Sequence, residues 1–471
     1  MLVALGNLAT LYEGLGDYHT ATKYHTRVLA EFEFAGYRGH VAVALHQLGN
    51  LHYVQSEYDQ ARQRYQQSIA IQLELGDRAG LAGNLDALGN LYFVQGEYAR
   101  AYEHYQQALA MAQELGNRAG AASTLQHLGI LHQRQGEYDR ARELYQQSLA
   151  INQELGIRAG VVSSLSRLGS MHEAQGEYGQ ARQRYQHSLA IQQELGDRAG
   201  VARSLGQLGI LHQRQGEYDR ARECYQQSLA MQRDLGDRAG MASSLHQLGV
   251  LDHDQGEYDR AREHYQQSLA INQELGIRAG VASSLHQLGI LHYDQGEYNP
   301  ARERYQESLA ILQKLGDRAG VASSLHQLGL LDYHQGEYDR ARELYQQSLV
   351  IEQELGNRSG VASSLHQLGI LHQRQGEYDR ARELYQQSLA IKQELGDRAG
   401  VAISLGQLGL LDERVGAVAP AVRHLAQALA LFERLGAPEH EQARRDLARL
   451  RDKMGAEAFD AALKDEPEAG T

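Results

Sequence analysis

Several features that stabilise or anchor other classes of protein are rare in this chain of 471 residues. It has a single cysteine, Cys224, which excludes an intrachain disulfide framework and fits a reducing compartment. Aromatic residues make up only 7% of the chain, which suits thin helical layers better than one compact core. No apolar run approaches the roughly 18–20 residues of a membrane span, and the first residues lack the features of a signal peptide. We therefore expect a soluble, cytoplasmic protein with no membrane partner.

Positive charge is also in short supply. The chain has 46 Lys and Arg against 59 Asp and Glu, and its net charge of −13 argues against a nucleic-acid partner, whose phosphates would be repelled. Catalytic and cofactor motifs are missing as well. There is no glycine-rich dinucleotide pattern and no P-loop, and His172-Glu173 lacks the second histidine of a zinc-protease motif. We expect a protein that is not an enzyme and that holds no cofactor and no metal.

What the chain has in abundance is internal repetition. A unit of 40 residues returns without insertion from Met1 to about residue 440, which gives eleven copies. Within one copy, Gly369–Ile391 is identical to Gly129–Ile151 in another. Position n of copy k is residue 40(k − 1) + n. Because each unit of such an array contacts only its neighbours, we interpret the chain as one quasi-linear array rather than as several domains.

Glycine and acidic residues divide each unit into two helices. Position 36 is glycine in all copies and position 16 in nearly all, and both follow a stretch of helical apolar periodicity, where a helix end requires positive φ. Position 37 is usually Asp or Asn, such as Asp77 or Asn117, and is a good N-cap. The pattern predicts helix A from about position 38 to position 15 of the next copy. It predicts helix B from about position 18 to position 35.

The most regular residues resemble those of the tetratricopeptide repeat. In the tenth copy they are Leu368-Gly369, Gly376, Tyr378, Ala381 and Tyr385. The usual repeat has 34 residues, and the longer form here is similar to the repeats of kinesin light chains, spindle-orientation adaptors and many bacterial regulators. The resemblance covers residues 1–440. It implies an all-α, right-handed superhelical solenoid of about eleven helix–turn–helix repeats that binds protein partners.

In that family the A helices line a concave groove through positions 3, 6, 7, 10, 13 and 14, which form one helical stripe. In this chain these positions vary between copies while the packing positions stay fixed. Their mixture of amides, aromatics and charges suits an extended or helical peptide, although an unliganded, solvated wall is the alternative. The partner-binding candidates that the resemblance implies are His46, Asn50, Tyr53, Asn90, Phe93, Arg134, Arg214, His246, His286, Tyr293, His326, Tyr333, His366 and Arg374.

Two binding modes of the family can be compared with these positions. Asn50 and Asn90 match an asparagine ladder that holds the peptide backbone in relatives, but later copies carry apolar residues or Ser170 at position 10. That mode is therefore confined to the first three copies. The carboxylate clamp of chaperone-binding members needs Lys or Arg at position 6, where this chain has Gly, His, Asp, Gln or Ser. We do not expect binding of a chaperone tail.

Position 6 is histidine in four consecutive copies, and we call His246, His286, His326 and His366 the histidine ladder. Three interpretations are open: a metal site, a groove that gains positive charge below about pH 6.5, or duplication of an ordinary surface histidine. A metal site is disfavoured because packed helices lie about 8–10 Å apart, whereas Zn–N bonds are about 2.0–2.1 Å long.

The two ends of the array depart from the consensus. Met1 lies inside a predicted A helix and leaves Leu2 and Val3 uncovered, so we expect either self-association through this uncapped repeat or a longer parent protein. Residues 441–464 predict one amphipathic capping helix, and residues 465–471 predict a disordered tail. Two functional hypotheses follow. The first is a non-enzymatic scaffold that binds a partner segment in the concave groove, and the second is the sensor or regulatory region of a larger bacterial signalling or transcription-regulating protein.

Overall fold

The computed structural model describes residues 2–14 and 16–464, with the backbone alone for residues 2–4. This part of the chain is all helical and contains no strand. The A helices are α1 (Leu2–Gly14), α3 (Arg38–Val54), α5 (Arg78–Val94), α7 (Arg118–Arg134), α9 (Arg158–Ala174), α11 (Arg198–Arg214), α13 (Arg238–Asp254), α15 (Arg278–Asp294), α17 (Arg318–His334), α19 (Arg358–Arg374) and α21 (Arg398–Arg414). The B helices are α2 (Tyr18–Phe34), α4 (Tyr58–Leu75), α6 (Tyr98–Glu114), α8 (Tyr138–Glu154), α10 (Tyr178–Leu195), α12 (Tyr218–Leu235), α14 (Tyr258–Leu275), α16 (Tyr298–Leu315), α18 (Tyr338–Glu354), α20 (Tyr378–Glu394) and α22 (Val418–Leu435). They are followed by α23 (His440–Met454) and α24 (Ala456–Lys464).

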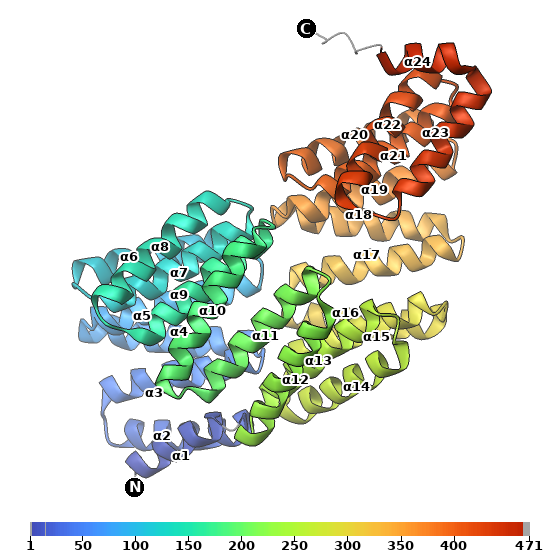
Figure 1. Ribbon diagram of the computed structural model, residues 1–471. Coiled ribbons are helices and arrows are strands. Elements are labelled where there is room, and N and C mark those ends of the chain that lie inside the picture. The colour runs from blue at the N-terminus through green and yellow to red at the C-terminus, as the bar shows by residue number, and fades with distance from the viewer. Residues whose placement is uncertain (1, 15, 465–471) are drawn as a thin grey trace. The chain divides into compact units, whose positions relative to one another are not determined.

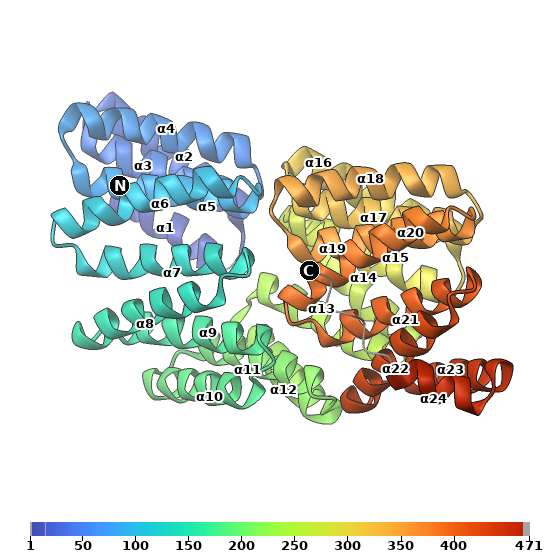
Figure 2. The same cartoon turned by 90° about the horizontal axis from the view of Figure 1, so that it is seen from above.

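The chain divides into two compact units, residues 1–324 and residues 325–471. In unit 1 the helices stack in chain order (Figures 1 and 2), and each packs against the next. The A helices of neighbouring repeats also contact one another, as α3 does α5, α5 does α7, α7 does α9, α11 does α13 and α13 does α15. Unit 1 therefore has a closely spaced layer of A helices. In unit 2, helices α18 to α23 also pack in chain order, and α24 packs against α22 and α23.

The helix boundaries confirm the predicted phase of the repeat. Helix A runs from position 38 to position 14, and helix B from position 18 to position 34 or 35, each within a residue of the prediction. Gly36 and Gly76 have φ of 72° and 67°, and Ser56, the exception at position 16, has φ of 61°. Asp77 caps α5 as expected, since its Oδ1 accepts a hydrogen bond from Gly80 N at 3.0 Å. Local signals were therefore enough to place the elements.

Within a repeat, the two helices are held together by a glycine, a tyrosine and a serine. At Gly209 on α11, a Cβ atom would lie 2.5 Å from Cε1 of Tyr225 on α12, so only glycine lets the ring lie this close to the backbone. The Tyr225 ring is fully buried. Nearby, the Ser228 hydroxyl donates to the Ala202 carbonyl at 2.8 Å. The same contacts recur at positions 9, 25 and 28 along the array, which explains why these three positions hardly vary.

Neighbouring repeats are joined by apolar contacts between helix B of one and helix A of the next. Ala181 and Tyr185 of α10 pack against Leu208 and Leu211 of α11, and all four side chains are buried. Equivalent clusters recur at other repeat boundaries. Neither helix pair could bury these side chains alone, so stability comes from stacking.

The C-terminal cap differs from the prediction. The expected single helix over 441–464 is two helices, α23 and α24, because Gly455 adopts φ 86° and ψ 153°, far from helical values. Leu447 and Leu450 of α23 and Ala462 of α24 pack onto α22. The predicted tail, residues 465–471, lies outside the described residues, as do the side chains of Leu2 and Val3. Self-association through α1 and the right-handed sense of the superhelix stay predictions.

Candidate partner-binding groove

The candidate residues lie on the A helices, and their side chains are neither uniformly exposed nor uniformly buried. Arg134, Arg214 and Arg374 are exposed, and His366 is buried. The other ten are half-buried: His46, Asn50, Tyr53, Asn90, Phe93, His246, His286, Tyr293, His326 and Tyr333. Those of unit 1 thus form a partly accessible wall along the layer of A helices.

The two asparagines are partly engaged within their own repeats. Asn50 Oδ1 accepts a hydrogen bond from the Tyr65 hydroxyl at 2.8 Å, and Asn90 Oδ1 accepts one from Tyr105 at the same distance. Their carbonyl oxygens therefore help to satisfy buried tyrosines. Each amide NH₂ group, with its two donors, has no partner among the described residues.

The aromatic candidates at position 13 pack against the first tyrosine of helix B. Ring centroids lie 5.9 Å apart for Tyr53 and Tyr58, and 5.6 Å for Phe93 and Tyr98. The same contact occurs for Tyr293 and Tyr333. Burial raises the pKa of the Tyr53 hydroxyl to about 12, so it stays protonated and can donate at neutral pH. These rings support the groove wall as well as contributing to its surface.

In unit 2 the structure brings two candidates together. Arg374 Nε donates to the Tyr333 hydroxyl at 3.0 Å, and the guanidinium lies 6.0 Å from the centre of that ring. They line a pocket of about 280 Å³ together with Ile370, Gln373, Gln407 and Arg414.

The histidine ladder is less exposed than its sequence pattern indicated. Each ring packs against the position 25 tyrosine of its own repeat, with centroids 5.7 Å apart for His246–Tyr265 and 5.4 Å for His286–Tyr305. Burial lowers the pKa of all four, and that of His286 and His366 to about 4. These histidines should therefore titrate below pH 6.5, which weakens the basis of the pH-sensitive groove. Among the described residues, no three His, Cys, Asp or Glu side chains gather as a metal ion would require.

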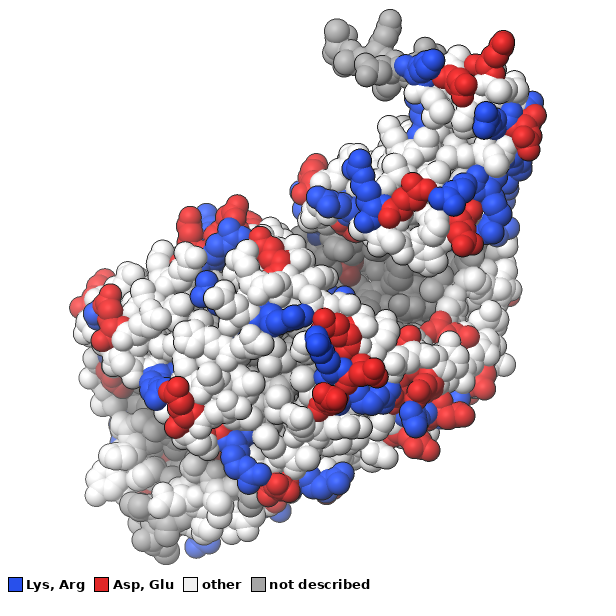
Figure 3. Space-filling view, in the orientation of Figure 1, with Lys and Arg blue, Asp and Glu red and all other residues white. Residues whose placement is uncertain are grey.

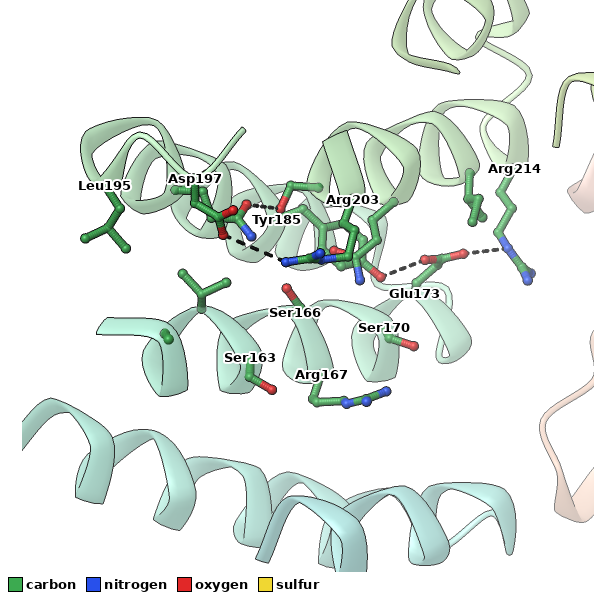
Figure 4. A pocket seen from close by; sticks show the side chains of 16 residues that line it. Ser163, Ser166, Arg167, Ser170, Glu173, Tyr185, Leu195, Asp197, Arg203 and Arg214 are labelled. Carbon is green, nitrogen blue, oxygen red and sulfur yellow. Dashed lines mark hydrogen bonds and ion pairs between the residues drawn. The ribbon is translucent and has the colours of Figure 1, made fainter. Parts of the chain in front are cut away.

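A pocket of the A-helix layer lies where the ladder is absent. It has a volume of about 570 Å³ and lies between α9 and α11, with the end of α10 beside it (Figure 4). Position 6 is Ser166 on α9, which lines this space, and Gly206 on the neighbouring α11. A Cβ atom built at Gly206 would meet nothing within 4 Å. Two repeats after Ser166, His246 lines a smaller pocket of about 260 Å³.

Three arginines and two carboxylates line this pocket. Arg214 Nε pairs with Glu173 Oε1 at 2.7 Å, and the other oxygen of Glu173 accepts from the Tyr185 hydroxyl at 2.9 Å. Arg203 lies between Glu173 and Asp197 in Figure 4, and its Nη2 is 3.8 Å from Asp197 Oδ2. The third arginine, Arg167, has no hydrogen-bond or ion-pair partner among the described residues. Elsewhere the charges of both signs are interspersed over the visible face (Figure 3).

A family model described as tetratricopeptide repeat matches residues 1–74, 81–154, 160–234, 240–314, 320–394 and 360–434. Together these matches cover most of the chain. The protein belongs to the tetratricopeptide repeat family. No curated protein matches the chain.

Solved structures of similar tetratricopeptide-like arrays share little sequence with it. BtubC (BKLC) from P. vanneervenii is 22% identical, with a TM-score of 0.39 over 50% of this chain and 91% of that one. The apo form of RapI is 16% identical, with a TM-score of 0.46 over 61% of this chain and 99% of that one. In the described part of this chain, no helix has both the length and the apolar character needed to cross a membrane.

Within this tetratricopeptide array, sequence reasoning selected Arg214 but missed the pocket to which it belongs. Ser166, Arg167, Glu173 and Arg203 were not among the candidates. The available signal was the loss of bulk at position 6 in two adjacent repeats, combined with arginines at positions 3, 7 and 14.

Proposed function

We propose that this tetratricopeptide array is a non-catalytic scaffold that binds a protein or peptide segment along the A-helix layer of unit 1. One observation carries the proposal. The pocket between α9 and α11 exposes polar groups with unused donors, on helices whose packing residues hardly vary. Such a concave site with a few convergent polar groups is typical of ligand recognition.

A peptide is the ligand that best fits the wider surface. Within unit 1, α3, α5, α7 and α9 contact one another in sequence, as do α11, α13 and α15, and the pocket lies between these two runs. The exposed positions of these helices form a row that is longer than the cavity alone. Along this row lie the free amide donors of Asn50 and Asn90 and the half-buried rings of Tyr53 and Phe93. Amide donors can hold a peptide backbone, and aromatic side chains can hold its apolar residues. We place this scaffold in a reducing compartment such as the cytoplasm because it has one cysteine.

The test is selection of peptides followed by mapping of where they lie. A random dodecapeptide library is panned against the full chain, and enriched peptides are resynthesised with a photo-crosslinking group. We expect the crosslinks, located by mass spectrometry, to fall on the A helices of unit 1. Failure to enrich any peptide, or crosslinks on the B helices, would contradict the proposal.

A further inference from the structure

We propose that the pocket between α9 and α11 receives a negatively charged side chain of the bound segment, a carboxylate or a phosphate. The inference rests on the proposed function and adds the chemistry of one residue of the partner. It does not use the position 6 cations of the family's carboxylate clamp, because that position is Ser166 and Gly206 here.

The pocket has room for such a group because two of its lining positions are small. Ser166 stands where repeats seven and eight carry His246 and His286, and Ser170 stands where they carry Val250 and Ile290. The volume of about 570 Å³ exceeds what one side chain needs, so the main chain of the segment can also enter the mouth. The space is polar on several sides, which disfavours an apolar anchor.

The carboxylates of the pocket are already used within the protein. Both oxygens of Glu173 are occupied, by the Tyr185 hydroxyl and by Arg214, and Glu173 is 9% exposed. Asp197 caps α11, with its Oδ1 accepting from Gly200 N at 2.9 Å. Glu173 is therefore occupied, whereas Asp197 keeps its Oδ2 3.8 Å from Arg203 and its side chain is 42% exposed. The two acids offset two of the three arginine charges.

The arginines retain donors. A guanidinium has five N–H donors, and Arg214 uses its Nε on Glu173 while its side chain remains 57% exposed. Arg203 is 68% exposed and lies at the outer range of an ion pair with Asp197. Arg167, on the adjacent face of α9, has no partner among the described residues. Three cations against two engaged carboxylates leave a local excess of positive charge, and planar guanidinium groups bind carboxylate and phosphate oxygens well.

Further along the A-helix layer of unit 1, carboxylates follow this pocket. On the next A helix, Asp254 accepts a hydrogen bond from Gln213 at 2.6 Å, and on the following one Asp294 pairs with His253 at 2.7 Å. These acids would repel a long acidic tract. We therefore infer one anionic position in the bound segment rather than an acidic tail.

The experiment compares three peptide libraries that differ only in a fixed central residue, which is glutamate, phosphoserine or glutamine. The binding affinity of each library is measured for the full chain and for the double variant Arg167→Gln/Arg203→Ser. This double variant installs the residues that repeats seven and eight carry at the same positions, Gln247 and Gln287, and Ser243 and Ser283, so the fold should tolerate it. A second variant, Ser166→His/Gly206→His, installs the histidines of repeats seven and eight while keeping all three arginines.

We expect glutamate or phosphoserine peptides to bind the native chain on the order of tenfold more tightly than glutamine peptides, and both double variants to abolish this difference. The anionic library that binds more tightly shows whether the pocket prefers a carboxylate or a phosphate. Equal binding of all three libraries would overturn the anionic anchor while leaving the scaffold proposal intact. Absence of binding by every library would instead contradict the scaffold itself, as would crosslinks outside the A helices.

Discussion

Repeats five and six carry Ser166 and Gly206 at position 6 of helix A, where repeats seven and eight carry His246 and His286. Each repeat buries a tyrosine at position 25 against a glycine at position 9. In repeats seven and eight, His246 and His286 lie over that tyrosine, and in repeats five and six the same position is Ser166 and Gly206. The positions that hold a repeat together are therefore separate from those that shape its surface. The pocket beside Ser166 has a volume of about 570 Å³, whereas the one beside His246 has about 260 Å³.

The largest expected effect concerns the glycine at position 9, which both pairs of repeats share. Gly209→Ala in repeat six and Gly289→Ala in repeat eight should each destabilise their repeat by roughly 2–3 kcal/mol, because the new Cβ would lie 2.5–2.6 Å from a buried tyrosine ring. Hydrogen exchange of the amides of α11 and α15 measures the local free energy of opening.

The matched control is Gly206→Ala, three residues earlier on α11, where a Cβ has open space. It should stabilise by about 0.5–1 kcal/mol, since it removes only the conformational freedom of glycine from a helix. Equal effects of the changes at 206 and 209 would refute close packing as the reason for glycine at position 9.

The second prediction is that stability depends more strongly on pH in a repeat with a ladder histidine than in one without it. Burial depresses the pKa of His286 to about 4, whereas an unfolded histidine titrates near 6.5. Between these values the unfolded state binds more protons, so stability should fall as the pH is lowered from about 6.5 to about 4. We expect His286 to contribute roughly 2 kcal/mol to this loss in repeat eight.

The check is an NMR titration of the histidine ring protons, with His286→Gln as the reference. Gln126 already occupies the same position in repeat four. The reference should lose less stability in acid than the native chain. A measured pKa near 6.5 for His286 would show that the ring is solvated and would restore the pH-sensitive groove as a hypothesis.

The third prediction concerns the hydroxyls of the position 25 tyrosines, whose hydrogen bonds also differ between the two pairs of repeats. Tyr225 donates to Gln213 Oε1 at 2.9 Å, whereas the buried hydroxyl of Tyr305 has no partner among the described residues. Tyr225→Phe should therefore destabilise repeat six by about 1 kcal/mol. Tyr305→Phe should be neutral or slightly stabilising, because it removes a buried polar group that gains no hydrogen bond. Denaturant midpoints of the two variants give the comparison, and a larger loss at Tyr305 would contradict it.

The sequence was sufficient to predict the helices but only part of the candidate groove, and the reasons are physical. Helix ends depend on local chemistry, such as positive φ at Gly76 and capping by Asp77, and these signals are written in consecutive residues. Gly455 carried the same kind of signal but was assigned to the interior of a single helix. The pocket depends instead on the small side chain of Ser166 and on residues of α9, α10 and α11 that only the folded chain brings together. The burial of the histidine ladder likewise follows from tertiary packing against tyrosines.

The smallest predicted effect concerns the start of the A helix in repeat eight. Asp237 caps α13, with Oδ1 accepting from Gly240 N at 2.8 Å, but the equivalent residue before α15 is Ile277, which makes no such bond. Ile277→Asp should supply the missing acceptor to Gly280 N and stabilise the repeat by about 0.5–1 kcal/mol. The reciprocal change, Asp237→Ile, should destabilise repeat seven by a similar amount, with denaturant midpoints as the measurement. Opposite shifts of similar size would show that position 37 acts through the helix N-cap in both repeats. Shifts of the same sign would mean that position 37 acts through some contact other than the helix N-terminus.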